Sequence, residues 1–116
     1  NVIEWNSPIL FRYIGDNEFM FIKNNGYVKS IRPEGTYWTT LLTNDPQCAK
    51  EILKLDREVK YRVAGPTLSA LSFIECERRP IPPQEAGLGK ITLEIIVRTA
   101  LVPFSIYDMI NKTLLT

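Results

Sequence analysis

Histidine is absent from the sequence. Its absence excludes Ser-His-Asp and Cys-His nucleophilic systems, imidazole general bases and histidine-ligated metals. Cysteine is scarce, with only Cys48 and Cys76, and the two are not in CxxC spacing. A structural zinc site would need carboxylates for its remaining ligands, which is unusual. We therefore expect no transition-metal site and no cofactor.

Long hydrophobic runs are missing as well. The longest apolar stretches, such as those at 19–22 and 100–104, are far shorter than the roughly 20 residues that cross a bilayer. We expect no membrane span. An excess of charge of one sign is also missing, because 14 Lys and Arg residues face 13 Asp and Glu residues. Duplex-DNA binding usually needs a strong basic excess, so only a local basic face could bind nucleic acid.

The chain has 116 residues, of which 45% are hydrophobic and 23% charged. These values are typical of one globular domain, and we expect residues 1–116 to form it. Within it, residues 1–103 form a β-rich body and residues 104–116 an apolar C-terminal segment. Because the sequence begins with Asn1, we expect a processed mature protein or a domain excised from a longer one.

Turn residues recur at short intervals, separated by segments rich in β-branched and aromatic residues. This rhythm predicts many short strands. Apolar and polar residues alternate at 59–63 and 91–97, which is typical of strands with one buried face. The sequence Asn24-Asn25-Gly26 predicts a hairpin that joins strands at 18–23 and 27–31, followed by a strand at 36–42.

Two segments have helical features. Asp45 as a cap and Pro46 at the first helical position predict a helix over Pro46–Leu55. Apolar residues at helical spacing predict a second helix over Ser105–Leu115. The predicted fold is mainly β, an antiparallel sandwich or partly open barrel, with one inserted helix and a C-terminal helix. An antiparallel α+β sheet is the alternative.

The first forty residues interleave basic and aromatic side chains. If these share a solvent-exposed face, the aromatic rings could stack on bases while the cations follow phosphates, as on an oligonucleotide-binding barrel. This interpretation requires Tyr13, Tyr27 and Tyr37 to lie on one surface with Lys23 and Arg32. The competing interpretation places the aromatic rings in the core. The predicted binding face comprises Arg12, Tyr13, Lys23, Tyr27, Lys29, Arg32 and Tyr37.

Carboxylates offer the remaining catalytic chemistry. Glu75 and Glu77 lie two residues apart on an expected strand and so share a face, where they could bind a hard cation or shift each other's pKa. Arg78 and Arg79 follow at once, which is equally typical of a solvated strand face. We expect the protein not to be an enzyme.

Two modifications are compatible with the sequence. Cys48 and Cys76 could form a disulfide in an oxidising compartment. The sequence is equally compatible with two free thiols in a reducing compartment. Asn111 begins a glycosylation sequon. The sequon and the even cysteine number favour an extracellular or secreted protein without establishing the compartment.

The C-terminal segment predicts a partner interface. Its apolar side chains should be buried, against either this domain or another chain, because terminal segments are usually polar and frayed. The residues that we expect at this interface are Phe104, Ile106, Met109 and Ile110.

The sequence therefore favours a non-catalytic protein-interaction, structural or assembly module, such as a processed extracellular or virion component. Its partner would be another protein or a second copy of the chain. A single-strand nucleic-acid-binding domain of the oligonucleotide-binding type is the alternative, and a small carboxylate-based enzyme is the third hypothesis.

Overall fold

The computed structural model describes residues 3–29, 33–72, 74–81 and 90–115. Seven strands form one antiparallel sheet in the order β6-β7-β3-β2-β5-β8-β9, and β1 pairs with β4 in a second, two-stranded sheet. The described elements are β1 (Ile3–Glu4), β2 (Ile9–Ile14), α1 (Asp16–Asn25), β3 (Thr36–Thr39), β4 (Leu42–Thr43), α2 (Pro46–Ile52), β5 (Tyr61–Thr67), a 3-10 turn (Leu68–Ala70), β6 (Cys76–Ile81), β7 (Thr92–Val97), β8 (Ser105–Asp108) and β9 (Thr113–Leu114). This arrangement confirms a mainly β fold of the sandwich or partly open barrel type, with a helix inserted after β4.

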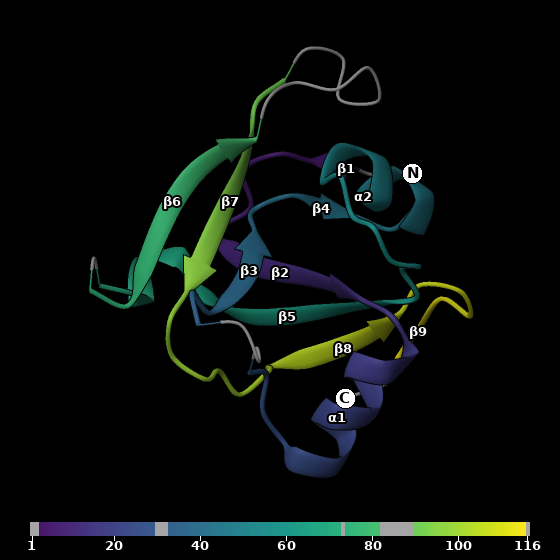
Figure 1. The fold of residues 1–116 in the computed structure, drawn as a ribbon. Helices are drawn as coiled ribbons and strands as arrows, with labels where there is room; N and C mark the ends of the chain where they lie inside the picture. The colour runs from purple at the N-terminus through teal and green to yellow at the C-terminus, as the bar shows by residue number, and fades with distance from the viewer. Residues whose placement is uncertain (1–2, 30–32, 73, 82–89, 116) are drawn as a thin grey trace.

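The large sheet bends sharply between its two halves. Figure 1 shows β6 and β7 crossing the direction of β2, β5 and β8. The bend falls at the junction of β2 and β3, which share only the pair Phe11 and Thr39. Beyond that pair the two strands diverge. Strands β6 and β9 are the two edges of the sheet.

Both faces of β2 are buried, because side chains alternate along a strand. Leu10 and Ile14 pack with the fully buried Trp38 in one hydrophobic cluster, which α1 covers. Phe11 and Tyr13 pack on the opposite face in a second cluster, which includes residues of α2. The central strand is therefore apolar on both sides, with one exception, Arg12.

Gly65 on β5 makes room for Trp38. A Cβ atom at position 65 would lie 2.7 Å from Cζ3 of the Trp38 ring, which is closer than any van der Waals contact allows. The indole Nε1 donates a hydrogen bond to Thr36 Oγ1 at 2.8 Å, so the buried ring has no unsatisfied polar group. The absence of a side chain at position 65 thus lets the tryptophan pack directly on the β5 backbone.

The hairpin predicted around Asn24-Asn25-Gly26 is wrong, because residues 16–25 form helix α1. Gly26 is the left-handed residue that ends this helix, with φ of 80°, and its N–H donates to the Ile22 carbonyl at 2.7 Å. An Asn-Gly pair suits a helix end as well as a tight hairpin. Burial favours the helix, since Phe19 and Ile22 at spacing i, i+3 both reach the core.

The predicted C-terminal helix is also wrong. Strands β8 and β9 form a hairpin, and β8 pairs with β5 within the large sheet. Asp108 directs the turn, because its Oδ1 accepts hydrogen bonds from the N–H groups of Ile110 and Asn111, both at 3.0 Å. Lys112 completes the turn with a φ of 57°. Local side-chain bonds of this kind compete with helix formation.

The inserted helix is confirmed, although it is shorter than predicted. It spans Pro46–Ile52, and Asp45 Oδ1 accepts the N–H groups of Gln47 and Cys48. The helix ends at Leu53, and Lys54 takes the left-handed conformation with φ of 54°. No helix in the described part of the chain is both long and apolar enough to cross a bilayer.

Candidate functional site

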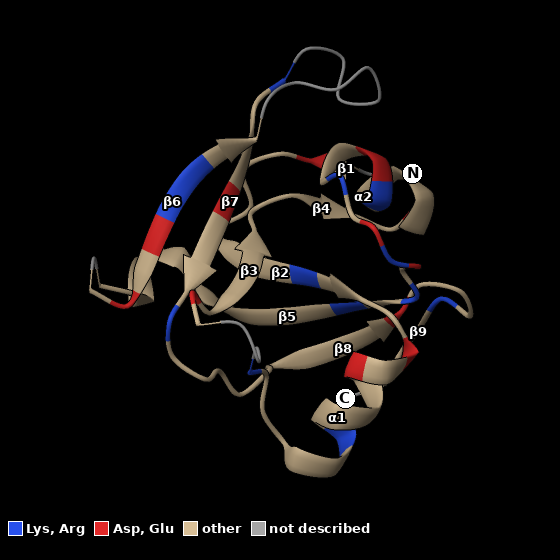
Figure 2. Cartoon of the chain, in the orientation of Figure 1, with Lys and Arg blue, Asp and Glu red and all other residues tan. Residues whose placement is uncertain are grey.

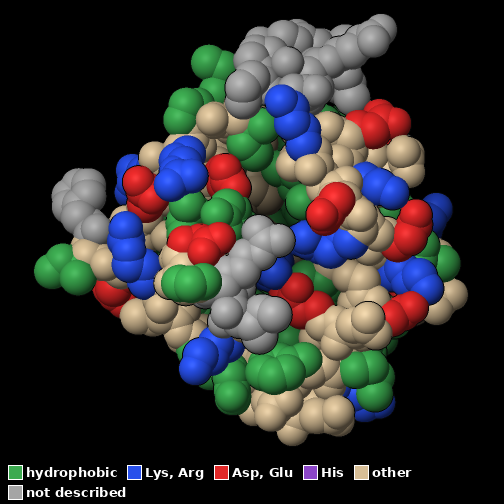
Figure 3. Space-filling view, in the orientation of Figure 1, with side chains coloured by type: hydrophobic (Ala, Val, Ile, Leu, Met, Phe, Trp, Pro, Cys, Tyr) green, Lys and Arg blue, Asp and Glu red, His purple; other side chains and the backbone are tan. Residues whose placement is uncertain are grey.

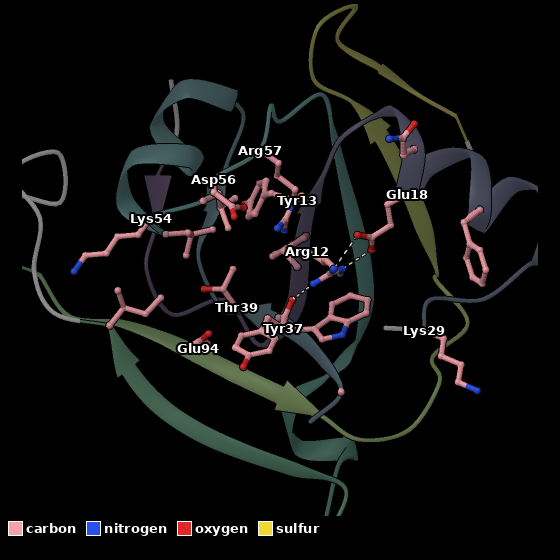
Figure 4. Close-up of a pocket in the computed structure, with 18 residues that line it drawn as sticks. Arg12, Tyr13, Glu18, Lys29, Tyr37, Thr39, Lys54, Asp56, Arg57 and Glu94 are labelled. Carbon is pink, nitrogen blue, oxygen red and sulfur yellow. Dashed lines mark hydrogen bonds and ion pairs between the residues drawn. The ribbon is translucent and has the colours of Figure 1, made fainter. Parts of the chain in front are cut away.

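A groove of about 770 Å³ crosses β2 and β3. Helix α1 borders it on one side and the segment at 53–57 on the other, with β7 along its lower edge (Figure 4). Its lining combines apolar side chains, among them Phe11, Leu53 and Ile81, with charged ones of both signs. The volume lies within the range of known ligand sites, about 300–1,000 Å³.

The base of the groove is an ion pair between Arg12 and Glu18. Arg12 Nε lies 2.5 Å from Glu18 Oε2, and Arg12 Nη2 donates to Glu18 Oε1 at 2.8 Å. The two side chains are only 11% and 26% exposed. Arg12 Nη1 also donates to the Tyr37 carbonyl at 2.8 Å. The guanidinium therefore links β2, α1 and β3 at the point where β2 and β3 diverge.

Tyr13 is buried beneath the groove. Its hydroxyl donates to the Leu41 carbonyl at 2.6 Å and accepts the Thr43 N–H at 3.0 Å. Burial raises the pKa of the Tyr13 phenol well above its ordinary value. The Arg57 guanidinium donates to the Tyr13 carbonyl at 2.9 Å. Tyr13 is thus a structural group and presents no free ring face to a ligand.

Glu94 on β7 is a partly buried carboxylate in this groove. It lies opposite Thr39 on β3 and Arg79 on β6, so the three side chains share one face of the sheet. Desolvation by burial raises the pKa of Glu94, and the nearby positive charge of Arg79 partly opposes that effect. Figure 4 shows Glu94 beside Thr39 and Tyr37.

The structure brings only part of the predicted basic and aromatic face together. Arg12, Tyr13, Lys29 and Tyr37 line the groove, whereas Lys23 and Tyr27 do not. Tyr13 is buried, Lys23 lies on α1, and Tyr27 packs edge-on against Phe21 with ring centroids 5.6 Å apart. Lys29 lies at the rim of the groove and points away from its base (Figure 4). Arg32 lies outside the described residues.

Charges of both signs intermingle on the surface around the groove. Figure 3 shows Lys and Arg side chains interspersed with Asp and Glu side chains across this face of the molecule. Nucleic-acid-binding surfaces instead gather positive charge along a stripe or patch. This face lacks that pattern.

The other predicted pairs are separated in the structure. Cys48 lies on α2 and Cys76 on β6, and both are free, so the predicted disulfide is not formed. Glu75 lies in the turn before β6, where its Oε1 accepts the Ser72 N–H, whereas Glu77 pairs with Arg79. In the described residues, no three cysteine or carboxylate side chains gather closely enough to hold a metal ion. The sequon residue Asn111 is exposed, in the turn between β8 and β9.

The predicted partner interface divides into buried and exposed residues. Ile106 and Met109 are 5% and 2% exposed because they pack in the two hydrophobic clusters of this chain, so they are not available to a partner. Phe104 and Ile110 remain 69% and 58% exposed. The edge strand adds two residues that the sequence did not indicate as interface residues, Leu114 and Leu115, which are 66% and 43% exposed. We call Phe104, Ile110, Leu114 and Leu115 the edge patch.

Glu18, Thr39 and Glu94 line the groove but were not predicted to do so. Each lies on an element that is distant in sequence from the others, and only the fold brings them together. No local motif marks these positions. The polar residues of the strand at 91–97 predicted a solvated face there, and Glu94 is the member of that face that the groove encloses.

No protein-family model, curated protein or solved structure matches the chain.

Proposed function

We propose that this domain is a non-catalytic assembly module that associates with a second copy of itself through strand β9. The observation that carries the proposal is the open edge of the sheet at β9, where the exposed apolar side chains of the edge patch accompany a backbone that pairs with no strand of the described residues other than β8. Monomeric proteins usually protect such edges, because an exposed and apolar edge strand pairs with other chains.

The backbone of Leu114 is directed outward from the sheet. Leu115 N donates to the Ile106 carbonyl at 2.8 Å, so Ile106 and Leu115 form a hydrogen-bonded pair. In an antiparallel pair of strands, every second residue forms backbone hydrogen bonds with the partner strand. The residues between them direct their N–H and C=O groups away from that strand. Leu114 therefore offers a donor and an acceptor to an incoming strand.

The opposite edge of the sheet is protected, by contrast. Strand β6 carries Glu77, Arg78 and Arg79, and Pro80 has no N–H to donate (Figure 2). Charged side chains and proline are common means of blocking edge pairing. Strands β8 and β9 together contain one charged residue, Asp108, whose carboxylate is engaged by the turn. The two edges therefore differ in their capacity to bind another chain.

The second copy is the occupant that the strand itself favours. Antiparallel pairing of β9 with its counterpart in a register centred on Leu114 lets each Leu114 donate its N–H to, and accept from, the Leu114 of the other copy. In that register Thr113 faces the Leu115 of the other copy, so no like charges oppose. Such pairing about a two-fold axis closes the assembly at a dimer.

Sedimentation velocity over a hundredfold range of concentration tests the proposal. We expect the chain to be a dimer at high concentration and to dissociate on dilution. Leu114→Lys should yield a folded monomer throughout the range, because it places a charge at the centre of the interface. Ile91→Lys is the matched control: Ile91 is similarly exposed at 61% but precedes β7, so its substitution should leave the dimer intact.

A monomeric wild-type chain at every concentration would contradict the proposal. A wild-type dimer that Leu114→Lys leaves unchanged would contradict the assignment of the interface to β9.

A further inference from the structure

We propose that the groove across β2 and β3 binds the guanidinium group of an arginine side chain presented by a peptide, with Glu94 as its counter-ion. This binding site is independent of the β9 edge.

Glu94 has no neutralising contact among the described residues. There its carboxylate makes no hydrogen bond and no ion pair. The positive charge of Arg79 acts on it, but the Arg79 guanidinium bonds Glu77 at 3.2 Å and is half exposed to solvent. Burial of Glu94 without a partner costs free energy, as the raised pKa of this carboxyl reflects. A bound cation would recover that loss.

The cations of the groove itself are directed elsewhere. Arg12 is engaged by Glu18 and by the Tyr37 carbonyl, and Arg57 donates to the Tyr13 carbonyl. Figure 4 shows that Lys29 and Lys54 extend away from Glu94. Glu94 is therefore the acidic group of the groove that is left for a ligand, since Glu18 is already paired and Asp56 is solvent-exposed.

The surroundings of Glu94 favour guanidinium over other cations. The Tyr37 ring lies beside the carboxylate of Glu94, and the Tyr37 hydroxyl donates to Glu34 Oε1 at 3.3 Å. A planar guanidinium can stack on an aromatic face while it donates two parallel hydrogen bonds to a carboxylate. A compact ammonium ion cannot do both in one plane.

The apolar lining suits the rest of such a side chain. Arginine carries a three-carbon stem that packs on apolar surface while the charged head stays polar. Phe11, Leu53 and Ile81 line the groove and provide that surface. The groove volume of about 770 Å³ exceeds what one side chain fills, so it also accommodates backbone on either side of the arginine. A peptide thus fits the groove better than a free cation.

Two-dimensional NMR titration tests the proposal with two acetylated heptapeptides, each of six alanines around one central residue. The central residue is arginine in one and citrulline, its neutral isostere, in the other. We expect saturable shifts of the Thr39 and Glu94 amide signals with the arginine peptide, and binding at least tenfold weaker with the citrulline peptide. Glu94→Gln should abolish that difference between the peptides.

Glu4→Gln is the control for net charge. Glu4 is exposed on β1 and is not one of the residues that line the groove, so its loss should leave the preference for arginine unchanged. Leu114→Lys should also bind the arginine peptide normally, which separates this proposal from that of the β9 dimer. The dispersion of the amide spectrum verifies that each variant is folded.

Three results would overturn the proposal: equal binding of the two peptides, retention of the arginine preference by Glu94→Gln, or absence of shifts at millimolar peptide. Methylguanidinium is the probe for a free cation. If it binds as tightly as the arginine peptide, the site takes free cations and the assignment to a peptide is wrong.

Discussion

Replacing Arg12 by methionine should destabilise the protein far more than removal of an exposed charge. The substitution keeps the length of the apolar stem but removes the guanidinium that joins β2, α1 and β3. Glu18 then keeps its charge with no partner, at 26% exposure, and the Tyr37 carbonyl loses a donor.

The magnitude follows from these two losses. Removing one member of a buried ion pair costs about 3–5 kcal/mol. Glu18 retains some contact with water, which reduces its share to below that range, about 2–3 kcal/mol. Loss of the hydrogen bond to the Tyr37 carbonyl adds about 1 kcal/mol. We therefore expect Arg12→Met to lower the free energy of unfolding by about 3–4 kcal/mol, a shift of the thermal midpoint of roughly 10–15 °C.

A double-mutant cycle separates the ion pair from simple packing. Glu18→Gln keeps one acceptor for Arg12 and should cost about 1–2 kcal/mol. The double variant Arg12→Met/Glu18→Gln buries no unpaired charge, so it should be more stable than the sum of the single effects implies, by about 1–2 kcal/mol. Urea denaturation followed by circular dichroism gives all three values.

The exposed pair of Lys60 and Asp16 provides the matched control. Its atoms lie 2.6 Å apart, but the side chains are 43% and 57% exposed, and water replaces such contacts readily. Lys60→Met should leave the midpoint nearly unchanged. The reasoning would be refuted if Arg12→Met were as stable as the wild type, or if the effects of the two single substitutions simply added.

Four further outcomes follow from the structure. Gly65→Ala should destabilise the fold by about 1–3 kcal/mol in thermal melting, because the new methyl group overlaps the Trp38 ring; an unchanged midpoint would contradict this packing. The N–H of Asn111 and its neighbours lower the pKa of Asp108 in the folded state, so this group contributes stability above its unfolded pKa that is lost as the pH falls through the folded value. Asp108→Asn should therefore flatten the decline of stability below about pH 4. If the stability of that variant declined with acid as steeply as that of the wild type, Asp108 would not be the group responsible. Reductant should change neither the intact mass nor the melting midpoint, because both cysteines are free, whereas a gain of two hydrogens would reveal a disulfide. Single-stranded oligonucleotides should not bind at low salt, since Tyr13 is buried, Arg12 is paired with Glu18, and charges of both signs intermingle on the surface around the groove; binding that weakens steeply with salt would reverse that conclusion.

Features that depend on local chemistry could be predicted from the sequence. The alternation at 91–97 gave strand β7, and Asp45 with Pro46 gave the start of α2. Both predictions depend only on residues that are close together in the sequence, so they did not require knowledge of the tertiary structure. The mainly β class followed from the same short-range patterns.

Local sequence patterns gave wrong predictions where the same residues are compatible with two different secondary structures. Asn25-Gly26 supports a tight hairpin or a helix end, and the choice depends on whether Phe19 and Ile22 have a core to enter. The apolar residues after Pro103 fit a helix as well as a strand pair, and the free edge of β5 made the strand the better solution.

The groove could not be predicted, because its walls come from segments that are far apart in the sequence. Arg12 meets Glu18 only because α1 folds back beside β2, and Glu94 joins them only through the β3–β7 register. The basic and aromatic residues of the first forty positions were read as consecutive strands. Because residues 16–25 form α1 instead of a strand, Lys23 and Tyr27 lie outside the groove that Arg12, Lys29 and Tyr37 line.

Amide hydrogen exchange at Leu114 tests the proposed assembly most directly, because its N–H points away from β8 toward the open edge. If β9 pairs with a second copy, exchange at Leu114 should slow as the protein concentration rises through the dimer transition. Arg78 is the reference, since its amide lies at the opposite, charged edge and should exchange rapidly at every concentration. Rapid, concentration-independent exchange at Leu114 in a sample that is dimeric by sedimentation would contradict pairing through β9.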